Sequence, residues 1–559
     1  MPLFDALEEE GVKANTMGEH SRAFVIGLDG GNLGLLKRLA QEGHMPFFSS
    51  LIRQGVCGEL RSISPPSTPP AWTTFMTGKN PGKHGVFDFF SYKNDLTPPR
   101  VVNSTFIRSA TLWSILSEAG KRIGVVNVPM TYPPQPVNGV MMTGLLTPST
   151  DLEFCYPASL YGELRRELGE FLIEVPWRDY VPERIPELFD ALAHCSRQRE
   201  KYVRALMLRE PWDFFMVVFS ETDSLQHALW SFLDQNDARH ADMEIQKRAQ
   251  GYFRLLDGIL EELCSLAGQD TRIFFMSDHG IGPLLKWVHM NTWLQCLGLL
   301  SLDPKRLLAM RGVKWFAEAV MRLDRHGWRK KLPFVPKASS DPASILRCIR
   351  WNRTKAFVAL SGEQGIRINL RGREPHGIVS PGREYEELRD QILMELRRLR
   401  DPETGEVVGT FARRREEVYA GQFMEQAPDI VFLLGEGRYV GDAFPGYPIF
   451  ERTNWKHGMG THRMEGLFLA VGPGIRTGQE VKGACIEDML PTLLYTLKQP
   501  IPASCDGKVL SDIFREEYLA GARPHYSESE WGAAEERDDF SEDEERDIIE
   551  KLRSLGYVD

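Results

Sequence analysis

Short runs of consecutive apolar residues, each followed at once by polar or acidic residues, recur along the chain. The clearest runs from Ala23 to Leu28 and stops at Asp29, which two glycines follow. Such runs are typical of strands buried on both faces, as in parallel sheets covered by helices. Further runs of this kind lie at 122–128, 212–219, 272–276, 429–434 and 467–471. The pattern predicts an α/β fold with a mostly parallel central sheet.

Longer stretches with helical periodicity separate these runs. The predicted helices cover residues 112–119, 185–208, 237–267, 385–399 and 486–497. Alternation of buried strands with such helices is typical of α/β proteins. At 559 residues, the chain is long enough for one large core with an insertion.

The region from 281 to 425 differs in character from the rest. Its pattern predicts a helix over 287–300 and a strand over 365–370, and its segment 303–340 is basic and aromatic. We expect that segment to be a solvated face, with a cover over a substrate entrance as the alternative. The predicted organisation is a first core part, an inserted cap region, a second core part and an acidic tail with a terminal helix, over residues 22–280, 281–425, 426–522 and 523–559.

Composition and targeting signals narrow the class of protein further. Eight cysteines are scattered without a Cys-x-x-Cys pair, which argues against a disulfide framework and a cysteine zinc site and favours a reducing compartment. The N-terminal residues have no apolar signal-peptide core, and the chain has no apolar run of about 18 residues. We therefore expect a cytoplasmic protein without a membrane span.

The net charge of −10 comes from one segment near the C-terminus. Residues 527–550 contain 12 acidic residues and two arginines, so the remainder of the chain is close to neutral. A neutral core argues against binding to a nucleic-acid polymer. The tail ends in an amphipathic segment, 548–557, which we expect to dock on the core or on another subunit of a homo-oligomer.

Candidate chemistry centres on Thr68, within the stretch 64–88. Pro69 and Pro70 follow it and suit the first turn of a helix, so Thr68 is predicted at or just before a helix N-terminus, where free amides and the helix dipole bind phosphate. A hydroxyl there is a candidate nucleophile if a base or a metal activates it. The alternatives are that Thr68 is only an N-cap and that Ser67 is the nucleophile.

Ligand-type side chains follow three of the predicted strands. Asp29 ends the first, Asp223 and His227 follow the second with helical spacing, and Asp278 and His279 follow the third. Ligands in α/β sheets gather at the carboxyl ends of the strands. The alternative for Asp29 is an N-cap of the next helix, and that for Asp223 and His227 is an ordinary surface pair.

A further histidine, either His457 or His462, lies near the C-terminal side of the predicted core. Three aspartates and three histidines suit two divalent cations, either zinc or manganese. Two such ions about 4 Å apart can activate an attacking oxygen and stabilise a leaving one in phosphoryl transfer.

Several motifs resemble one known family. They are GLDGG at 27–31, TPPAW with its following TG at 68–78, PGKHG at 81–85, TDSLQH at 222–227, SDHG at 277–280, GTH at 460–462 and GPG at 472–474. Together they resemble the alkaline phosphatase superfamily, specifically its type I phosphodiesterase/nucleotide pyrophosphatase branch, over most of residues 22–515. Stretches at 368–382, 400–408 and 506–510 also resemble a bacterial and archaeal subgroup of predicted phosphohydrolases or phosphomutases.

This resemblance implies an alkaline-phosphatase-like sandwich in which Thr68 is the nucleophile. Two metals, usually zinc in this family, would flank it. One metal would be held by Asp223, His227 and His462, which is favoured over His457 because the strand after it begins at a similar short distance in the subgroup. The other would be held by Asp29, Asp278, His279 and the Thr68 oxygen. Thr68 would attack phosphorus, and the resulting phospho- or nucleotidyl-threonine would then be hydrolysed.

The sequence departs from the family at one point that bears on the substrate. Phe89 occupies the place of an asparagine that binds a phosphoryl oxygen in nucleotide pyrophosphatases. The sulfatase motif is not met at Cys57 or Ser67. Candidates for contacts to substrate oxygens are Lys83, His84, Lys456 and Arg463, each with a structural or solvated role as the alternative.

The function that we predict is metal-dependent hydrolysis of a small phosphate ester, most simply a phosphodiester. A phosphomutase or a phosphomonoesterase with the same site is the first alternative. A non-catalytic partner protein is the second, and intact ligand residues argue against it.

Overall fold

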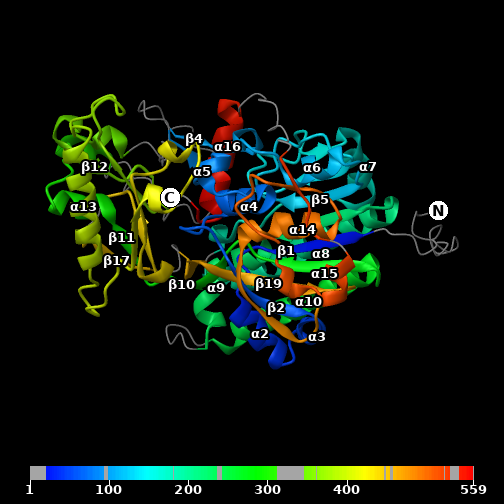
Figure 1. Cartoon of the computed structure of the whole chain (residues 1–559). Coiled ribbons are helices and arrows are strands. Elements are labelled where there is room, and N and C mark those ends of the chain that lie inside the picture. The colour runs from blue at the N-terminus through cyan, green and yellow to red at the C-terminus, as the bar shows by residue number, and fades with distance from the viewer. Residues whose placement is uncertain are drawn as a thin grey trace.

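The computed structural model describes residues 21–92, 99–180, 182–235, 242–310, 345–360, 362–445, 448–453, 458–521, 523–528 and 540–557. Its largest sheet has nine strands in the order β20-β2-β19-β9-β1-β8-β5-β6-β7 (Figure 1). From one edge to the other, these are Gln479–Cys485, Val56–Arg61, Glu465–Val471, Thr271–Met276, Arg22–Leu28, Phe214–Phe219, Ile123–Val128, Gly139–Thr143 and Cys155–Tyr156. The strands β9, β1, β8, β5 and β6 run parallel to one another. The mostly parallel central sheet predicted from the apolar runs is thereby confirmed.

The strand register brings the candidate metal ligands to the carboxyl ends of neighbouring strands, which we call the ligand edge of the sheet. Leu28 at the end of β1 lies opposite Phe219 at the end of β8, and Gly27 lies opposite Met276 at the end of β9. The three strands therefore end side by side. Asp29 and the segments beginning at Ser220 and Ser277 all leave the sheet at this edge.

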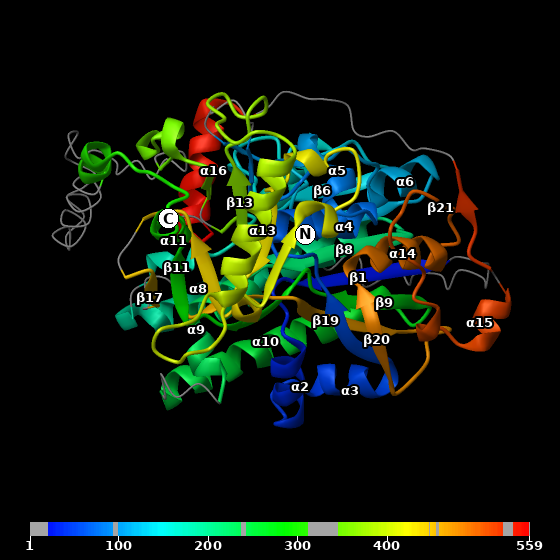
Figure 2. The same cartoon turned by 60° about the vertical axis from the view of Figure 1, so that its left-hand side comes forward.

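Helices cover both faces of this sheet (Figures 1 and 2). Those of one face are α2 (Leu33–Gln41), α3 (Pro46–Gln54), α8 (Ile185–Arg209), α9 (Glu221–Leu233) and α10 (Met243–Ala267). Those of the other face include α4 (Thr68–Thr77), α6 (Leu112–Glu118) and α14 (Met489–Thr496). The core strands β1 and β8 are almost wholly buried between these layers, which explains their unbroken apolar sequences.

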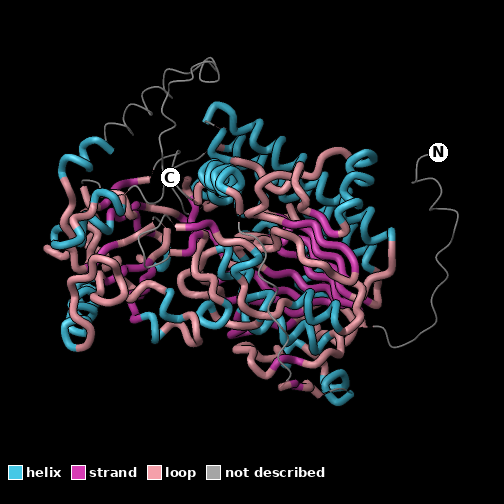
Figure 3. The backbone as a smooth tube through the Cα atoms, turned by 90° about the horizontal axis from the view of Figure 1, so that it is seen from above, coloured by secondary structure: helices cyan, strands magenta, loops and turns pink. Residues whose placement is uncertain are grey.

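The region predicted as an inserted cap, together with residues up to 452, forms smaller sheets beside the core. Four strands pair in the order β12 (Ala356–Phe357), β13 (Gly365–Ile368), β15 (Ile430–Leu433) and β14 (Phe411–Arg414), with α13 (Arg383–Arg398) against β14. Three more pair in the order β16 (Tyr439–Asp442), β11 (Lys286–His289) and β17 (Phe450–Arg452). Seen from above, these strands form a group apart from the large sheet (Figure 3).

Two sequence-based expectations about this region were wrong. The run at 429–434 is not a core strand, because β15 pairs with β13 and β14 in the four-stranded sheet. Its four residues are all buried, so its apolar pattern equals that of a core strand. The predicted helix at 287–300 begins only at Met290, as α11 (Met290–Cys296), since the preceding residues form β11. The basic segment 303–340 lies mostly outside the described residues.

The amphipathic segment near the C-terminus docks on the core. It forms α16 (Glu542–Ser554), which begins with a capping box between Ser541 and Glu544. Ile548 and Leu552 are its buried residues. Among the described helices, none combines the length and apolar character needed to cross a membrane.

A buried ion pair fixes the helix that follows β8. Arg199 on α8 and Glu221 at the start of α9 are both fully buried and paired, and Arg199 also donates to the carbonyls of Leu172 and Ile173. We expect Arg199→Met to lower the free energy of unfolding by about 3–5 kcal/mol, because Glu221 is left buried without its partner. Urea unfolding measures this, with the exposed Arg197→Met on the same helix as the control. Equal stability of the two variants would contradict the prediction.

Candidate active site with two groups of metal ligands

The first group of ligand-type residues lies at the ends of β1 and β9. His279 Nε2 is 3.2 Å from Asp278 Oδ2 and 3.8 Å from Asp29 Oδ1. The same nitrogen is 3.2 Å from Thr68 Oγ1 at the start of α4. All four residues are buried. Three segments far apart in the sequence thus place two carboxylates, an imidazole and a hydroxyl together.

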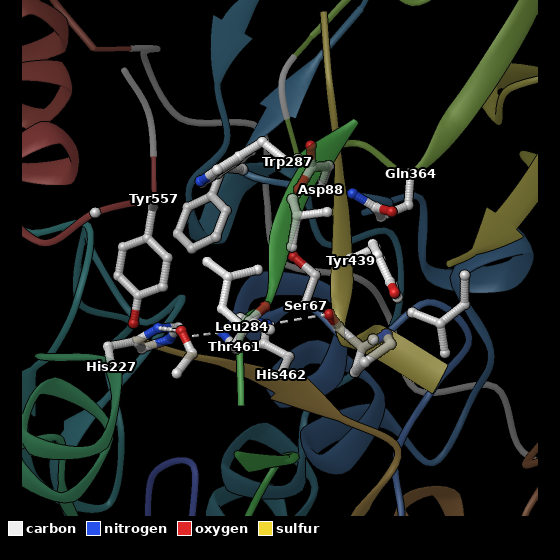
Figure 4. A pocket seen from close by; sticks show the side chains of 18 of the residues that line it. Ser67, Asp88, His227, Leu284, Trp287, Gln364, Tyr439, Thr461, His462 and Tyr557 are labelled. Carbon is white, nitrogen blue, oxygen red and sulfur yellow. Dashed lines mark hydrogen bonds between the residues drawn. The ribbon is translucent and has the colours of Figure 1, made fainter. Parts of the chain in front are cut away.

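The second group comes from α9 and from β18 (Gly460–Arg463), which pairs with β10 (Gly280–Pro283). His227 Nε2 is 3.3 Å from Asp223 Oδ1 and 3.1 Å from His462 Nε2. The ring of His462 stacks on that of His279, with the ring centroids 3.7 Å apart. The two groups are therefore direct neighbours, and Figure 4 shows His227 and His462 at one end of the pocket.

Glycine is required where the backbone passes between the groups. Gly30 has a φ of +64°, and a Cβ there would lie 2.7 Å from Asp223 Oδ1. The surrounding backbone is held by side chains of α9, since Thr222 donates to the carbonyl of Asp29 and Gln226 donates to that of Gly30. The turn after β1 and the first turn of α9 thus hold each other in place.

The carboxylate oxygens that face these groups suit cations. Asp29 Oδ1, Asp223 Oδ1 and Asp278 Oδ2 are buried and have no hydrogen-bond partner among the described residues. A buried carboxylate oxygen without a partner is costly unless a cation compensates it. Each of the two groups also places its ligand atoms within 4.8 Å of one another.

The tautomers of the three histidines also indicate that these groups bind metal. The Nδ1 atoms of His227, His279 and His462 each lie 2.9–3.2 Å from a backbone carbonyl, of Gly460, Gly280 and Pro66 respectively. A carbonyl can only accept, so Nδ1 carries the proton and Nε2 of the neutral ring keeps its lone pair. Metal-binding histidines are typically fixed in this way. The residues present therefore fit two divalent metals.

The electrostatics of the metal-free site reflect crowded carboxylates. Burial, with the neighbouring charges of Asp278 and Asp223, raises the pKa of Asp29 well above its usual value. Burial likewise raises the pKa of Asp278. Burial also acts to raise the pKa of Asp223, but without metal the charge of a protonated His227 outweighs this and brings the pKa below the usual range. Cations bound here would favour the ionised form of all three.

Thr68 is not the N-cap of its helix. Ser67 occupies that position without a side-chain cap, because its Oγ donates to Asp88 Oδ1 at 3.2 Å. The cap of α2 is Asn32 rather than Asp29. Thr68 Oγ1 instead faces His279, and the N-terminus of α4 points at the ligand groups. The helix dipole therefore places partial positive charge where an anionic substrate would lie.

A cavity of about 110 Å³ opens beside the second group. The core contributes Ser67, Asp88, Phe89 and Trp177 to its lining, among others. The inserted region contributes Trp287, Gln364 and Tyr439 (Figure 4). Six of its lining residues are Phe, Trp or Tyr, among them Tyr557 from the end of the described chain.

Three of the candidate substrate contacts make other interactions. Lys83 pairs with Asp506 and donates to the carbonyl of Ser504. His84 is fully buried beside Thr74, and burial lowers its pKa to about 3. Arg463 donates to the carbonyls of Thr461, His462 and Pro283. These three described residues are not among those that line the cavity. Lys456, like the alternative ligand His457, lies outside the described residues.

The sequence reasoning missed two residues of the site. Tyr557 donates a hydrogen bond to Asp223 Oδ2 at 2.7 Å, and burial beside Asp223 raises its pKa well above the usual value, so it keeps its proton. Its signal in the sequence was the amphipathic pattern of the segment 548–557, of which it is the last residue; that pattern predicted docking but no role in the site. Asp88 belongs to the quoted stretch 64–88, but nothing in its spacing marked it.

Burial raises the pKa of Asp88 to about 7, with the charge of Glu363 as the second cause. Since its unfolded pKa is about 3.9, the unfolded chain loses this proton first, and stability falls between about pH 4 and pH 7. We therefore expect Asp88→Asn to raise the melting temperature relative to wild type at pH 7.5 far more than at pH 4.5. Thermal scans of metal-loaded protein measure this, with the exposed Asp512→Asn as the control. A pH-independent difference would contradict the assignment.

A hydroxyl beside two groups of metal ligands can take part in phosphoryl transfer, and the fold around it is alkaline-phosphatase-like. The chain belongs to the type I phosphodiesterase/nucleotide pyrophosphatase family, whose model matches residues 23–460. It is therefore a hydrolase acting on phosphoric ester bonds, of a family that typically depends on divalent metals and acts on small phosphate esters.

Two crystal structures of a phosphonoacetate hydrolase share this fold at low sequence identity. Phosphonoacetate hydrolase from Sinorhizobium meliloti 1021, in complex with phosphonoformate, is 14% identical, with a TM-score of 0.53 over 86% of this chain and 95% of that one. Its complex with phosphonoacetate is 13% identical over the same shares, with a TM-score of 0.51. Human ectonucleotide pyrophosphatase/phosphodiesterase 5 is 12% identical over 89% of this chain and 100% of that one, with a TM-score of 0.49. A comparison with curated proteins finds no match.

Proposed function

We propose that the chain is a metal-dependent phosphodiesterase in which Thr68 is the nucleophile. The observation that carries the proposal is the position of Thr68 Oγ1, which lies 3.2 Å from His279 Nε2 in the first ligand group. The second ligand group packs directly against the first through the stacked rings of His279 and His462. Asp29, Asp278 and His279, with Thr68, would hold one cation. Asp223, His227 and His462 would hold the other. The nitrogen and carboxylate ligands suit zinc, with manganese as the alternative.

Two divalent cations bound there would supply the positive charge that favours an ionised hydroxyl and stabilises developing negative charge on phosphoryl oxygens. Residues of the chain would carry out the other parts of the reaction. Thr68 Oγ1 gives up its proton and attacks phosphorus, and the first alkoxide leaves and is protonated to the alcohol. The phosphorus, with its second ester group, stays bonded to Thr68 Oγ1. Water then cleaves the bond between Thr68 Oγ1 and phosphorus, which releases a phosphate monoester and restores the hydroxyl. The dipole of α4 favours the anionic substrate throughout these steps.

We further propose that the inserted region acts as a cap that selects substrates. Trp287, Gln364 and Tyr439 reach the cavity from its two small sheets, while the ligand groups belong mainly to the core. Substrate size and shape would thus be read by the insert, and the chemistry would be performed by the core. This division follows the predicted cap region, although the small sheets extend beyond its predicted end at residue 425.

Hydrolysis of bis-p-nitrophenyl phosphate and of p-nitrophenyl phosphate, each with added zinc or manganese, tests the proposal. We expect the diester to have the higher kcat/KM. A preference for the monoester would instead indicate a phosphatase. Phosphate returned to a substrate with two hydroxyls would indicate a mutase. Metal-loaded protein that turns over no phosphate ester would contradict the proposal and favour a binding role.

A further inference from the structure

The segment that contains α16 is anchored to the core by contacts from several parts of the chain. Val101 N donates to Glu545 Oε1 at 2.8 Å, and Tyr132 donates to Glu544 Oε1 at 3.1 Å. Lys551 Nζ donates to the carbonyl of Thr147 at 2.9 Å. With Ile548 and Leu552 buried, this helix is a packed element of the fold.

The chain beyond α16 turns toward the candidate metal ligands. Trp177 Nε1 donates to the carbonyl of Leu555 at 2.7 Å and fixes the start of the turn. Gly556 follows with a φ of +88°, and a Cβ there would lie 2.5 Å from the Trp177 ring. Only glycine meets both conditions, so this turn is built to direct the next residue, Tyr557, inward.

The ring of Tyr557 lies against the residues of the pocket. Its centroid is 4.6 Å from that of Phe89 and 6.0 Å from that of His227. Figure 4 shows Tyr557 beside His227. Its hydroxyl reaches Asp223 Oδ2 at 2.7 Å. The two oxygens of Asp223 therefore face different groups. Oδ2 accepts from Tyr557, whereas Oδ1 faces His227 Nε2 and has no hydrogen-bond partner among the described residues.

We propose that Tyr557 is a positioning residue, which holds Asp223 so that Oδ1 is presented to the cation of the second ligand group. This inference rests on the proposed function, because it needs that cation. A hydrogen bond to the carboxylate oxygen that does not bind the metal fixes the rotation of the carboxylate. Loss of such a contact typically weakens metal affinity about 10–100-fold. The α16 segment thereby becomes part of the metal site although it supplies no ligand.

Metal titration against a chromophoric chelator tests the proposal on the whole chain. For Tyr557→Phe, which keeps the ring and removes only the hydroxyl, we expect one of the two zinc affinities to weaken about 10–100-fold and the other to stay unchanged. The control is Tyr526→Phe, at a tyrosine that is 50% exposed on β22 (Tyr526–Ser527). Gly556→Ala provides a second variant, which keeps the hydroxyl but displaces it, and it is expected to weaken the same affinity.

The outcomes separate this inference from the function on which it rests. Wild-type protein that binds no zinc would refute the proposed function. Wild type that binds two ions, with Tyr557→Phe identical to it, would refute only the positioning role. A lowered melting temperature with unchanged zinc affinity would assign Tyr557 a structural role. A raised kcat with unchanged affinity would show that the side chain obstructs the pocket, which also overturns the proposal.

Discussion

Thr68→Ala is expected to lower kcat for bis-p-nitrophenyl phosphate by at least about 10³-fold, as removal of a nucleophile does in other covalent mechanisms. The variant should still fold and bind metal. Among the described residues, the hydrogen-bond partner of Thr68 Oγ1 is His279, and the other ligands of that group remain in place. Thr68→Ser keeps a hydroxyl at the same position and is expected to retain much of the activity. Initial rates at saturating substrate, with added zinc, measure these effects.

The control for this substitution is Thr73→Ala on the same helix. Thr73 is fully buried, but its Oγ1 donates within α4 to the carbonyl of Pro69. This change tests for damage to α4 without touching the site. If Thr73→Ala lost as much activity as Thr68→Ala, the loss would reflect damage to the helix. If Thr68→Ala stayed active, another group, such as Ser67, would be the nucleophile.

Removal of metal is expected to abolish turnover and to lower stability. The buried oxygens of Asp29, Asp223 and Asp278 would lose the cations that compensate them. A ligand held at 100 times its dissociation constant stabilises the folded state by about 2.7 kcal/mol per site, so chelation should lower the melting temperature measurably. Thermal scans with EDTA, and with zinc or manganese restored, measure this change.

This effect should depend on pH in a definite direction. Metal binds the deprotonated ligands, and without metal the pKa values of Asp29 and Asp278 are raised. At pH 5 these carboxyls are therefore more often neutral, and less is gained from metal. The difference in melting temperature between loaded and chelated protein is expected to grow from pH 5 to pH 8. A chelated protein with full activity and an unchanged melting temperature would contradict the account.

The central sheet and its edge chemistry could be predicted because parallel strands impose convergence. An apolar run that ends in Asp29 fixes where that carboxylate lies once its neighbours are parallel strands, and the registers of β8 and β9 confirm this. A local signal predicted the position of Thr68, because Pro69 and Pro70 mark the first turn of α4. Local pattern and topology agreed at these points.

The features that the sequence did not predict depend on contacts between distant segments, which no local pattern encodes. The run at 429–434 has the composition of a core strand, but pairing with β13 and β14 decides its sheet. The sequence makes Lys83 a candidate for contact with substrate, but Lys83 pairs with Asp506, which lies more than 400 residues further along the chain. Tyr557 reaches Asp223 only because α16 docks where it does. Amphipathicity predicted the docking but not its place.

Crystals of the zinc-loaded protein, measured on either side of the zinc absorption edge, test the central claim most directly. The account predicts two anomalous peaks. One should lie among Asp29, Asp278, His279 and Thr68 Oγ1, and the other among Asp223, His227 and His462. The absence of a peak from both positions, under conditions in which the enzyme turns over a phosphodiester, would contradict it.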